Sequence, residues 1–114
     1  MKVAIIGGNE SCLELVDKEL MSLIEESGNY LFTVIGGYMG ELDSANPPLA
    51  YHWARYRGLP YAPKKYYSLD SMMHGVAAAA DYIVFLNDDS QIIKRFIMIY
   101  RQTGKHGSVI NYGK

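Results

Sequence analysis

The sequence predicts an α/β fold in which a five-stranded parallel sheet carries helices on both faces. Apolar runs typical of buried strands alternate with amphipathic helical patterns along the chain, giving the order β-α-β-α-β-α-β-α-β. Two of these runs, Val3–Ile6 and Phe32–Ile35, are followed at once by the glycine pairs Gly7-Gly8 and Gly36-Gly37. Glycines at the ends of parallel strands let the backbone turn sharply and approach a ligand closely. Together the observations indicate a Rossmann-like domain with a ligand at the carboxyl edge of its sheet.

Length and composition limit the class of protein. The chain has 114 residues, so we expect residues 1–114 to form a single domain with one core. No stretch approaches the ~20 apolar residues of a membrane span, and the first apolar run is interrupted too early for a signal peptide. A lone cysteine, Cys12, excludes an internal disulfide and fits a reducing compartment. We therefore expect a soluble cytoplasmic protein without a membrane partner.

The strands are expected where apolar residues follow one another, and the helices where capping residues and glycines bound an amphipathic pattern. In the first half we expect a strand over 2–6, a helix from the capping box Ser11–Glu14 to Gly28, a strand over 31–35, a loop over 36–48 and a helix over 49–57. In the second half we expect a short edge strand over 59–61, a loop over 62–68, a helix over 69–80 capped by Ser68, a strand over 82–86, a helix from Ser90 to Gly104 and a strand at 109–110.

Right-handed crossovers allow two strand orders, 3-2-1-4-5 and 2-1-3-4-5, and we adopt the first. Ligands of such sheets bind where the strand order reverses, which here lies between the first and fourth strands. One wall of the expected crevice is Gly7 to Ser11, and the other is Asn87 to Ser90. The pair Gly36-Gly37 would flank it on the second strand.

Three short motifs resemble a known family. The run Gly36 to Asp43 has the form Gly-Gly-x-x-Gly-x-x-Asp, and Ala50 to Pro60 has the form Ala-x-x-x-Ala-x-x-x-Gly-Leu-Pro. An Ala-Asp-x-x-Val-Phe strand follows at Ala80 to Phe85. Over residues 2–111 the chain resembles the SLOG superfamily, the Rossmann-like domains related to DNA-processing Smf proteins and to the LOG cytokinin-activating hydrolases. Within it, the chain is most similar to the small stand-alone YspA-like proteins of bacteria and phages.

The resemblance implies a nucleotide or nucleotide-derived ligand, often bound by a dimer. By position, the implied binding residues are Gly7, Gly8, Gly36, Gly37, Gly40 and Asp43. LOG enzymes place a glycine-rich stretch with a catalytic glutamate after the fourth strand, whereas Asn87 to Ile92 contains no glycine, threonine or glutamate. The first loop also lacks the arginine common in YspA-like proteins. These departures favour binding without LOG-type catalysis.

The loops after the strands supply the candidate ligand-binding residues. The full set is Gly7, Gly8, Asn9, Glu10, Ser11, Gly36, Gly37, Gly40, Asp43, Asn87, Asp88 and Ser90. Glu10, Asp88 and Asp89 are the candidates for catalysis, because carboxylates around one crevice can serve N-glycosidic bond chemistry. They could instead orient a ribose, or the two aspartates could only finish a strand and start a helix. Neither a dinucleotide fingerprint nor a P-loop is present, and the three histidines are dispersed, so we expect no cofactor and no metal.

Tyrosines and bases alternate in the middle of the chain. Residues 47–67 carry four bases and no acid, interleaved with five tyrosines. Such interleaving can stack single-stranded nucleic acid, but the net charge of −1 provides no wider basic field, so nucleic acid is not expected. Tyrosine and arginine are also enriched at protein interfaces. We expect Tyr61, Tyr66 and Tyr67 to form a self-association surface of a homo-oligomer.

The sequence thus predicts a small nucleotide-binding module with a sensing or regulatory role. One alternative is an enzyme that cleaves or exchanges an N-glycosidic bond of a nucleoside or nucleotide. Another is an interaction protein that uses its tyrosine-rich and basic segment. The residues leave open whether the ligand is turned over.

Overall fold

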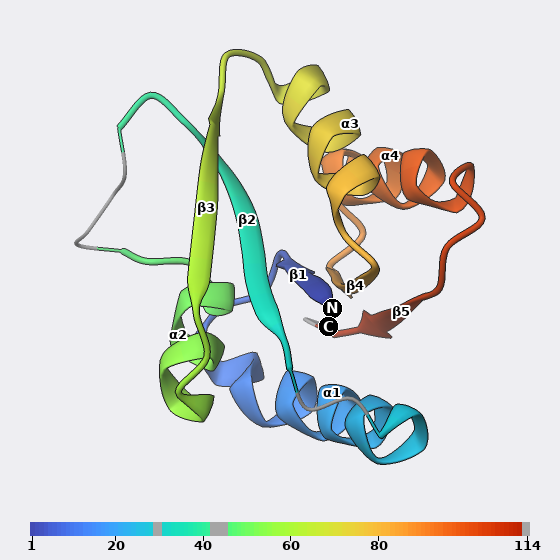
Figure 1. Cartoon of the computed structure of the whole chain (residues 1–114). Helices are drawn as coiled ribbons and strands as arrows, with labels where there is room; N and C mark the ends of the chain where they lie inside the picture. Colours follow the sequence, from blue (N-terminus) through green and yellow to red (C-terminus); the bar gives the residue numbers. More distant parts are fainter. Residues whose placement is uncertain (29–30, 42–45, 113–114) are drawn as a thin grey trace.

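A parallel sheet of five strands in the order β3-β2-β1-β4-β5 forms the centre of the molecule (Figure 1). The computed structural model describes residues 1–28, 31–41 and 46–112. The strands are β1 (Lys2–Ile6), β2 (Thr33–Met39), β3 (Tyr61–Tyr66), β4 (Tyr82–Asn87) and β5 (Gly107–Asn111). The helices are α1 (Leu13–Ser27), α2 (Leu49–Arg57), α3 (Leu69–Ala79) and α4 (Gln91–Arg101), and one 3-10 turn, η1 (Glu10–Cys12), precedes α1. The predicted α/β class and the order 3-2-1-4-5 are confirmed.

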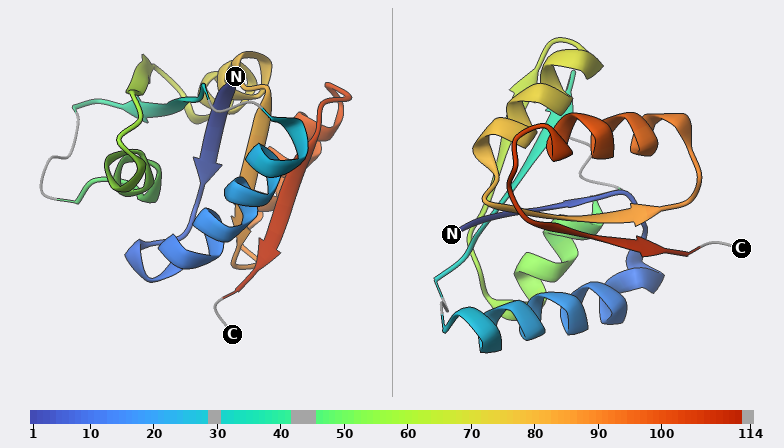
Figure 2. Two further views of the ribbon diagram at one scale, coloured as in Figure 1. Left: turned by 60° about the horizontal axis from the view of Figure 1, so that its bottom comes forward. Right: turned by 90° about the vertical axis from the view of Figure 1, so that its right-hand side faces the viewer.

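The helices cover the two faces of the sheet in pairs. Figure 2 shows α1 and α2 on one face and α3 and α4 on the other, so the domain has three layers. The change of face falls between α2 and α3, where the chain crosses from one edge of the sheet to β4. The reversal of strand order is therefore located between β1 and β4, as the sequence predicts.

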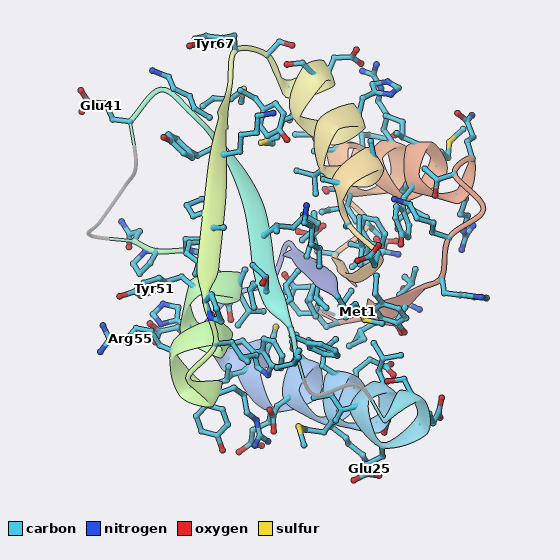
Figure 3. The ribbon with its side chains drawn as sticks, viewed as in Figure 1. Met1, Glu25, Glu41, Tyr51, Arg55 and Tyr67 are labelled. Atoms are coloured by element: carbon cyan, nitrogen blue, oxygen red, sulfur yellow. The ribbon has the colours of Figure 1, made fainter. Side chains whose placement is uncertain are left out.

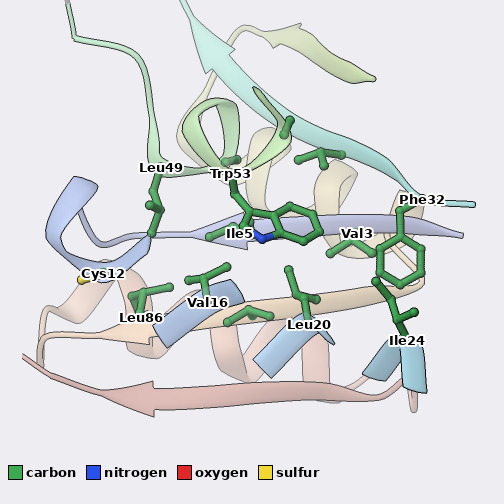
Figure 4. Packing of buried hydrophobic residues seen from close by; sticks show 14 residues of the cluster. Val3, Ile5, Cys12, Val16, Leu20, Ile24, Phe32, Leu49, Trp53 and Leu86 are labelled. Carbon is green, nitrogen blue, oxygen red and sulfur yellow. The ribbon is translucent and has the colours of Figure 1, made fainter. Parts of the chain in front are cut away.

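The core under α1 and α2 is built around Trp53, which is fully buried (Figure 4). Val16 and Leu20 of α1 belong to the same cluster, as do β-strand residues such as Val3. Asp17 of α1 reaches across to α2, where its Oδ1 accepts hydrogen bonds from the indole Nε1 of Trp53 at 2.9 Å and from Nε of Arg57 at 2.7 Å. Its Oδ2 accepts a third from Nη2 of Arg57 at 2.6 Å, so one carboxylate joins two helices.

The opposite core is built around Phe85, whose ring makes an edge contact with Phe96 of α4, the ring centroids lying 5.5 Å apart. Buried Tyr100 lies beside them, and its hydroxyl donates to the carbonyl oxygen of His106 at 2.6 Å. Burial, with Asp81 and Tyr82 nearby, raises the pKa of Tyr100 to about 12. This hydroxyl therefore stays a neutral donor that fastens the chain entering β5 to α4.

Two element boundaries differ from the predictions at the strands of one edge. Residues 62–66, predicted as loop, belong to β3, because their backbone pairs with β2 from Val34↔Tyr61 to Met39↔Tyr66. Correspondingly, β2 does not end at Ile35 but continues to Met39. Only its first three residues pair with β1, so β2 and β3 extend beyond β1 as a two-stranded ribbon.

The start of the first helix also differs. Ser11 is not its N-cap, and the predicted capping box does not form. Asn9, with extended backbone, caps the 3-10 turn η1 instead, its Oδ1 accepting the N–H of Ser11 at 2.9 Å. The other predicted caps are confirmed, since Ser68 and Ser90 accept backbone N–H groups at the starts of α3 and α4, and Gly28 and Gly58 end α1 and α2 with positive φ.

Candidate functional site

Three cavities surround the N-terminus of α2, and Pro48, its N-cap, lines all three. We call them together the α2 groove. The largest, the tyrosine cavity of about 590 Å³, lies between α2 and the β2–β3 ribbon. The glycine cavity of about 190 Å³ lies at the carboxyl end of β1, beside the middle of β2. The loop cavity of about 480 Å³ lies against the loop after β1. Because the three cavities share the lining residue Pro48, they lie next to one another.

The tyrosine cavity has aromatic and proline walls. Tyr51 of α2 and Tyr61 of β3 meet edge to face with ring centroids 5.8 Å apart. Tyr38 and Pro63 continue the wall along the ribbon, and burial raises the pKa of Tyr61, so its hydroxyl remains neutral. Figure 3 shows Tyr51 and Glu41 on the side of β3 away from α3. The cavity therefore offers flat apolar surfaces next to a carboxylate.

The glycine cavity brings together three of the predicted glycines, Gly7, Gly36 and Gly37. The prediction that the second pair ends its strand is wrong, because Gly36 and Gly37 lie inside β2 and pair with Pro63 and Lys64 of β3. A Cβ on Gly37 would lie 2.6 Å from Cγ of Met72, so this glycine lets α3 approach the ribbon. The left-handed residue that ends β2 is Gly40, with a φ of 72°, which lines none of the three cavities.

The loop cavity collects four other predicted residues: Gly8, Asn9, Glu10 and Ser11. It also contains His52, which the sequence did not mark as a site residue. Nε2 of His52 lies 2.9 Å from Oε1 of Glu10, and the His52 side chain is only 26% exposed. The two residues are 42 positions apart, and only the packing of α2 against η1 brings them together. A carboxylate and an imidazole in contact can hold hydroxyl groups of a ligand or share a proton.

The loop after β4 lies apart from the α2 groove. Two side-chain oxygens bond within the loop: Oδ1 of Asn87 accepts the N–H of Asp89, and Oδ1 of Asp88 accepts the N–H of Ser90, both at 3.0 Å. The latter bond lowers the pKa of Asp88. Nδ2 of Asn87 also donates to Oδ1 of Asn111 in β5 at 2.9 Å. Ser90 caps α4. Of the alternatives drawn from the sequence, these contacts match the one in which Asp88 and Asp89 finish a strand and start a helix.

The expected crevice between β1 and β4 is closed by packing. Gly7 and Gly8 both have positive φ and lie directly against β4. A Cβ on Gly7 would be 2.8 Å from the carbonyl oxygen of Leu86, and a Cβ on Gly8 would be 2.9 Å from Cγ of the same leucine. The open space lies instead on the β2 side of β1. Residues of the first predicted wall, Gly7 to Ser11, line cavities of the α2 groove, whereas those of the second, Asn87 to Ser90, line none of the three.

The remaining predicted residues have varied placements. Asp43 lies outside the described residues. Tyr61 lines the groove, and Tyr66 packs on α3, where a Cβ on Gly75 would lie 2.3 Å from Cε1 of its ring. Tyr67 is 88% exposed, with Nζ of Lys65 5.6 Å from its ring centroid. Of the three tyrosines expected at an interface, only Tyr67 presents its ring to solvent, and oligomerisation stays a prediction.

Within residues 1–28, 31–41 and 46–112, no group of three or more His, Cys, Asp or Glu side chains is placed to hold a metal ion. In the same part of the chain, every helix is too short or too polar to span a bilayer.

Comparisons with known proteins identify the fold class and no family. No protein-family model matches the chain, and no curated protein matches it. The structure of E. coli tRNA N6-threonylcarbamoyladenosine dehydratase, TcdA, in complex with AMP is similar with a TM-score of 0.50 at 11% identity, covering 99% of this chain and 50% of the TcdA chain. A universal stress protein family member from Burkholderia pseudomallei has a TM-score of 0.47 at 11% identity, covering 96% of this chain and 94% of that protein. The chain thus spans half the length of TcdA, and at this identity the likeness shows the Rossmann-like fold alone.

Proposed function

We propose that this chain is a small nucleotide-binding module whose ligand, a nucleotide or a nucleotide-derived molecule, lies in the α2 groove. The observation that carries the proposal is the position of the groove. It lies at the carboxyl edge of β1 and β2, which is where α/β sheets bind ligands, and its largest cavity has the size of a small-molecule site. Backbone at Gly7 and Gly36 and the aromatic wall at Tyr51 and Tyr61 suit a flat base attached to a sugar.

Two further lines support a nucleotide-type ligand. TcdA, whose fold is similar, was solved in complex with AMP. The resemblance of the sequence motifs to the SLOG superfamily implies a ligand of the same class. Neither feature of LOG catalysis, the glycine-rich stretch and its glutamate, follows β4 in this chain. A module that binds such a ligand without LOG-type turnover would serve sensing or regulation in the cytoplasm.

The contact between Glu10 and His52 favours one second candidate function, an enzyme acting on an N-glycosidic bond. Glu10 lies in the loop cavity, where a carboxylate could act as nucleophile or as acid and base, with His52 beside it. Asp88 and Asp89, the other candidates, line none of the three cavities. Free base released during incubation with a nucleoside or nucleotide would support this candidate over a pure binder.

A thermal-shift screen tests the proposal. The protein is heated with nucleosides, nucleotides, dinucleotides and cyclic nucleotides, and each mixture is then analysed for free base. A ligand at 100 times its Kd adds about 2.7 kcal/mol of stability, an easily measured shift. Absence of a shift across the whole panel contradicts the proposal.

A matched pair of variants on one helix then locates the ligand. Tyr51→Ala removes an aromatic wall of the groove and should abolish the ligand-induced shift. Tyr56→Ala makes the same truncation on the exposed side of α2, at a residue that is 63% exposed and lines none of the three cavities, and should keep the shift. Each shift is measured against the melting temperature of the same variant without ligand. Equal ligand shifts in both variants would place the ligand outside the α2 groove.

A further inference from the structure

We propose that the α2 groove selects an uncharged nucleoside over the corresponding nucleotide, with the base in the tyrosine cavity and the ribose against Glu10. This inference rests on the proposed function and narrows its ligand class. It follows from the charges that line the groove, from the backbone at the start of α2 and from the separation of aromatic and polar walls.

The charge of the groove is unfavourable for a phosphate. The described residues that line its three cavities include the carboxylates Glu10 and Glu41, and they include neither lysine nor arginine. A phosphoryl group with up to two negative charges would lie near these carboxylates without a lysine or arginine among the described lining residues to balance it, and the His52 imidazole of the loop cavity is already in contact with Glu10. At separations below the Debye length of about 8 Å, such repulsion is only partly screened at physiological salt.

The four basic side chains between residues 47 and 67 contact other groups. Arg57 forms its bidentate pair with Asp17 at the C-terminal end of α2, whereas the groove surrounds the N-terminus of this helix. Nη1 of Arg55 donates to the hydroxyl of Tyr51 at 2.9 Å, and the arginine itself lines no cavity of the groove. Lys64 and Lys65 lie over the rings of Tyr66 and Tyr67. None of these four basic side chains therefore lines the groove, and Arg55 contacts it through the hydroxyl of Tyr51.

The backbone at the start of α2 also offers an anion fewer donors than most helix N-termini do. Helix N-termini bind phosphates through free N–H groups. The N-cap of α2 is Pro48 and the residue before it is Pro47, and a proline has no N–H to donate. The next turn is partly used as well, because the N–H of Tyr51 donates to the carbonyl oxygen of Pro48 at 3.0 Å.

The two ends of the groove match the two parts of a nucleoside. The tyrosine cavity provides aromatic faces and prolines on which a base can stack. The loop cavity, which shares Pro47 and Pro48 with it, provides Glu10. The contact with His52 uses Oε1 of this carboxylate, and an ionised carboxylate can accept several hydrogen bonds, so Glu10 can also accept those of the two ribose hydroxyls.

Isothermal titration with adenosine, guanosine, cytidine, uridine and their 5′-monophosphates tests the inference. We expect the best-bound nucleoside to bind at least tenfold more tightly than its monophosphate at 50 mM salt, with a smaller ratio at 500 mM because salt screens the repulsion. Its 2′,3′-dideoxy analogue should bind more weakly than the nucleoside. Glu10→Gln should bring two affinity ratios toward one, that of nucleoside to monophosphate and that of nucleoside to dideoxy analogue. Glu14→Gln, the same change on exposed α1 surface outside the groove, should leave both ratios unchanged.

The outcomes separate this inference from the proposed function. A monophosphate that binds as tightly as its nucleoside, or more tightly, overturns the selection for an uncharged ligand while a nucleotide-binding module stands. If Glu10→Gln still binds the nucleoside more tightly than its dideoxy analogue by the wild-type ratio, the proposed ribose contact is wrong. If neither nucleosides nor monophosphates bind at millimolar concentration, this inference is wrong, and if the dinucleotides and cyclic nucleotides of the thermal-shift panel also fail to bind, the proposed function is wrong as well. Circular dichroism of the free variants shows whether a loss of binding reflects a loss of fold.

Discussion

The carboxylate of Asp17 should be a main determinant of how firmly α1 is attached to α2. It accepts one hydrogen bond from Trp53 and two from Arg57, at 2.6 to 2.9 Å. Trp53 is fully buried, so in Asp17→Ala its indole N–H would lose its partner inside the core, at a cost of about 1–3 kcal/mol. The side chain of Arg57 is 34% exposed and can be rehydrated, so its pair with Asp17 adds only about 0.5–1 kcal/mol. We therefore expect Asp17→Ala to lower the free energy of unfolding by about 3 kcal/mol.

Graded variants distinguish the two contributions. Asp17→Asn keeps an oxygen for the indole N–H but loses the charge, and should cost about 1 kcal/mol. Arg57→Ala should cost about as much, since it leaves the hydrogen bond to Trp53 in place. Urea unfolding followed by the fluorescence of the single tryptophan measures the free energy of unfolding of all three variants. The same unfolding transitions are followed by circular dichroism as a check. A cost below about 0.5 kcal/mol for Asp17→Ala would refute the reasoning.

The contribution of Asp17 should also depend on pH. Its hydrogen bonds with Arg57, helped by the one from Trp53, hold the pKa of the carboxyl below its ordinary value of 3.8 in the folded state. The stability that the charge contributes is thus fully present above pH values near 4 and is lost as the pH falls through the lowered folded-state pKa. Asparagine does not titrate, so the difference between wild type and Asp17→Asn should shrink as the pH falls toward 2. A constant difference would contradict this account.

Three more perturbations follow from single contacts. Gly7 has a φ of 85°, and a Cβ there would lie 2.8 Å from a β4 carbonyl oxygen, so Gly7→Ala should lower the free energy of unfolding by more than 2 kcal/mol, of which ~1–2 kcal/mol comes from the φ alone. Gly58 has a φ of 67° and open space around it, so Gly58→Ala should lower it by about 1 kcal/mol. Urea unfolding measures both variants. Because the folded-state pKa of Tyr100 is about 12 against an ordinary 10.0, this tyrosine should make wild-type stability fall by up to about 1.4 kcal/mol per pH unit between pH 10 and 12. Tyr100→Phe should make the slope of stability against pH shallower by that amount in alkaline unfolding experiments. Tyr67→Ser should dissociate any homo-oligomer in sedimentation velocity at micromolar concentration without changing the melting temperature of the monomer. A wild-type protein that is monomeric there would refute the self-association surface.

The order of the elements could be predicted from the sequence because it follows from local patterns. Apolar runs without alternation mark β1 and β4 as strands buried on both faces, and alternation of strand and helix requires a parallel sheet. Capping by Ser68 and Ser90 and termination at Gly28 and Gly58 are also local, since each depends on the backbone within a few residues.

Pairing at the edge of the sheet could not be predicted in this way. The segment Tyr61–Tyr66 contains a proline and two lysines and has little intrinsic strand signal. It becomes β3 because β2 offers a complete row of backbone partners. The same pairing places Gly36 and Gly37 inside a strand, where Gly37 admits Met72 of α3, although a glycine pair after an apolar run is typical of a turn.

The sequence by itself determined the class of fold and restricted the strand order to two possibilities, because hydrophobic periodicity and chain connectivity are properties of neighbouring residues. It also predicted the edge of the sheet where a ligand would bind. Only the tertiary structure decided which space at that edge is open. Packing of Gly7 and Gly8 on Leu86 closes the β1–β4 side, and docking of α2 opens the groove on the β2 side. The same docking joins Glu10 to His52 and Asp17 to Trp53. These partners are 42 and 36 residues apart, and no local pattern specifies which side chains two packed helices bring into contact.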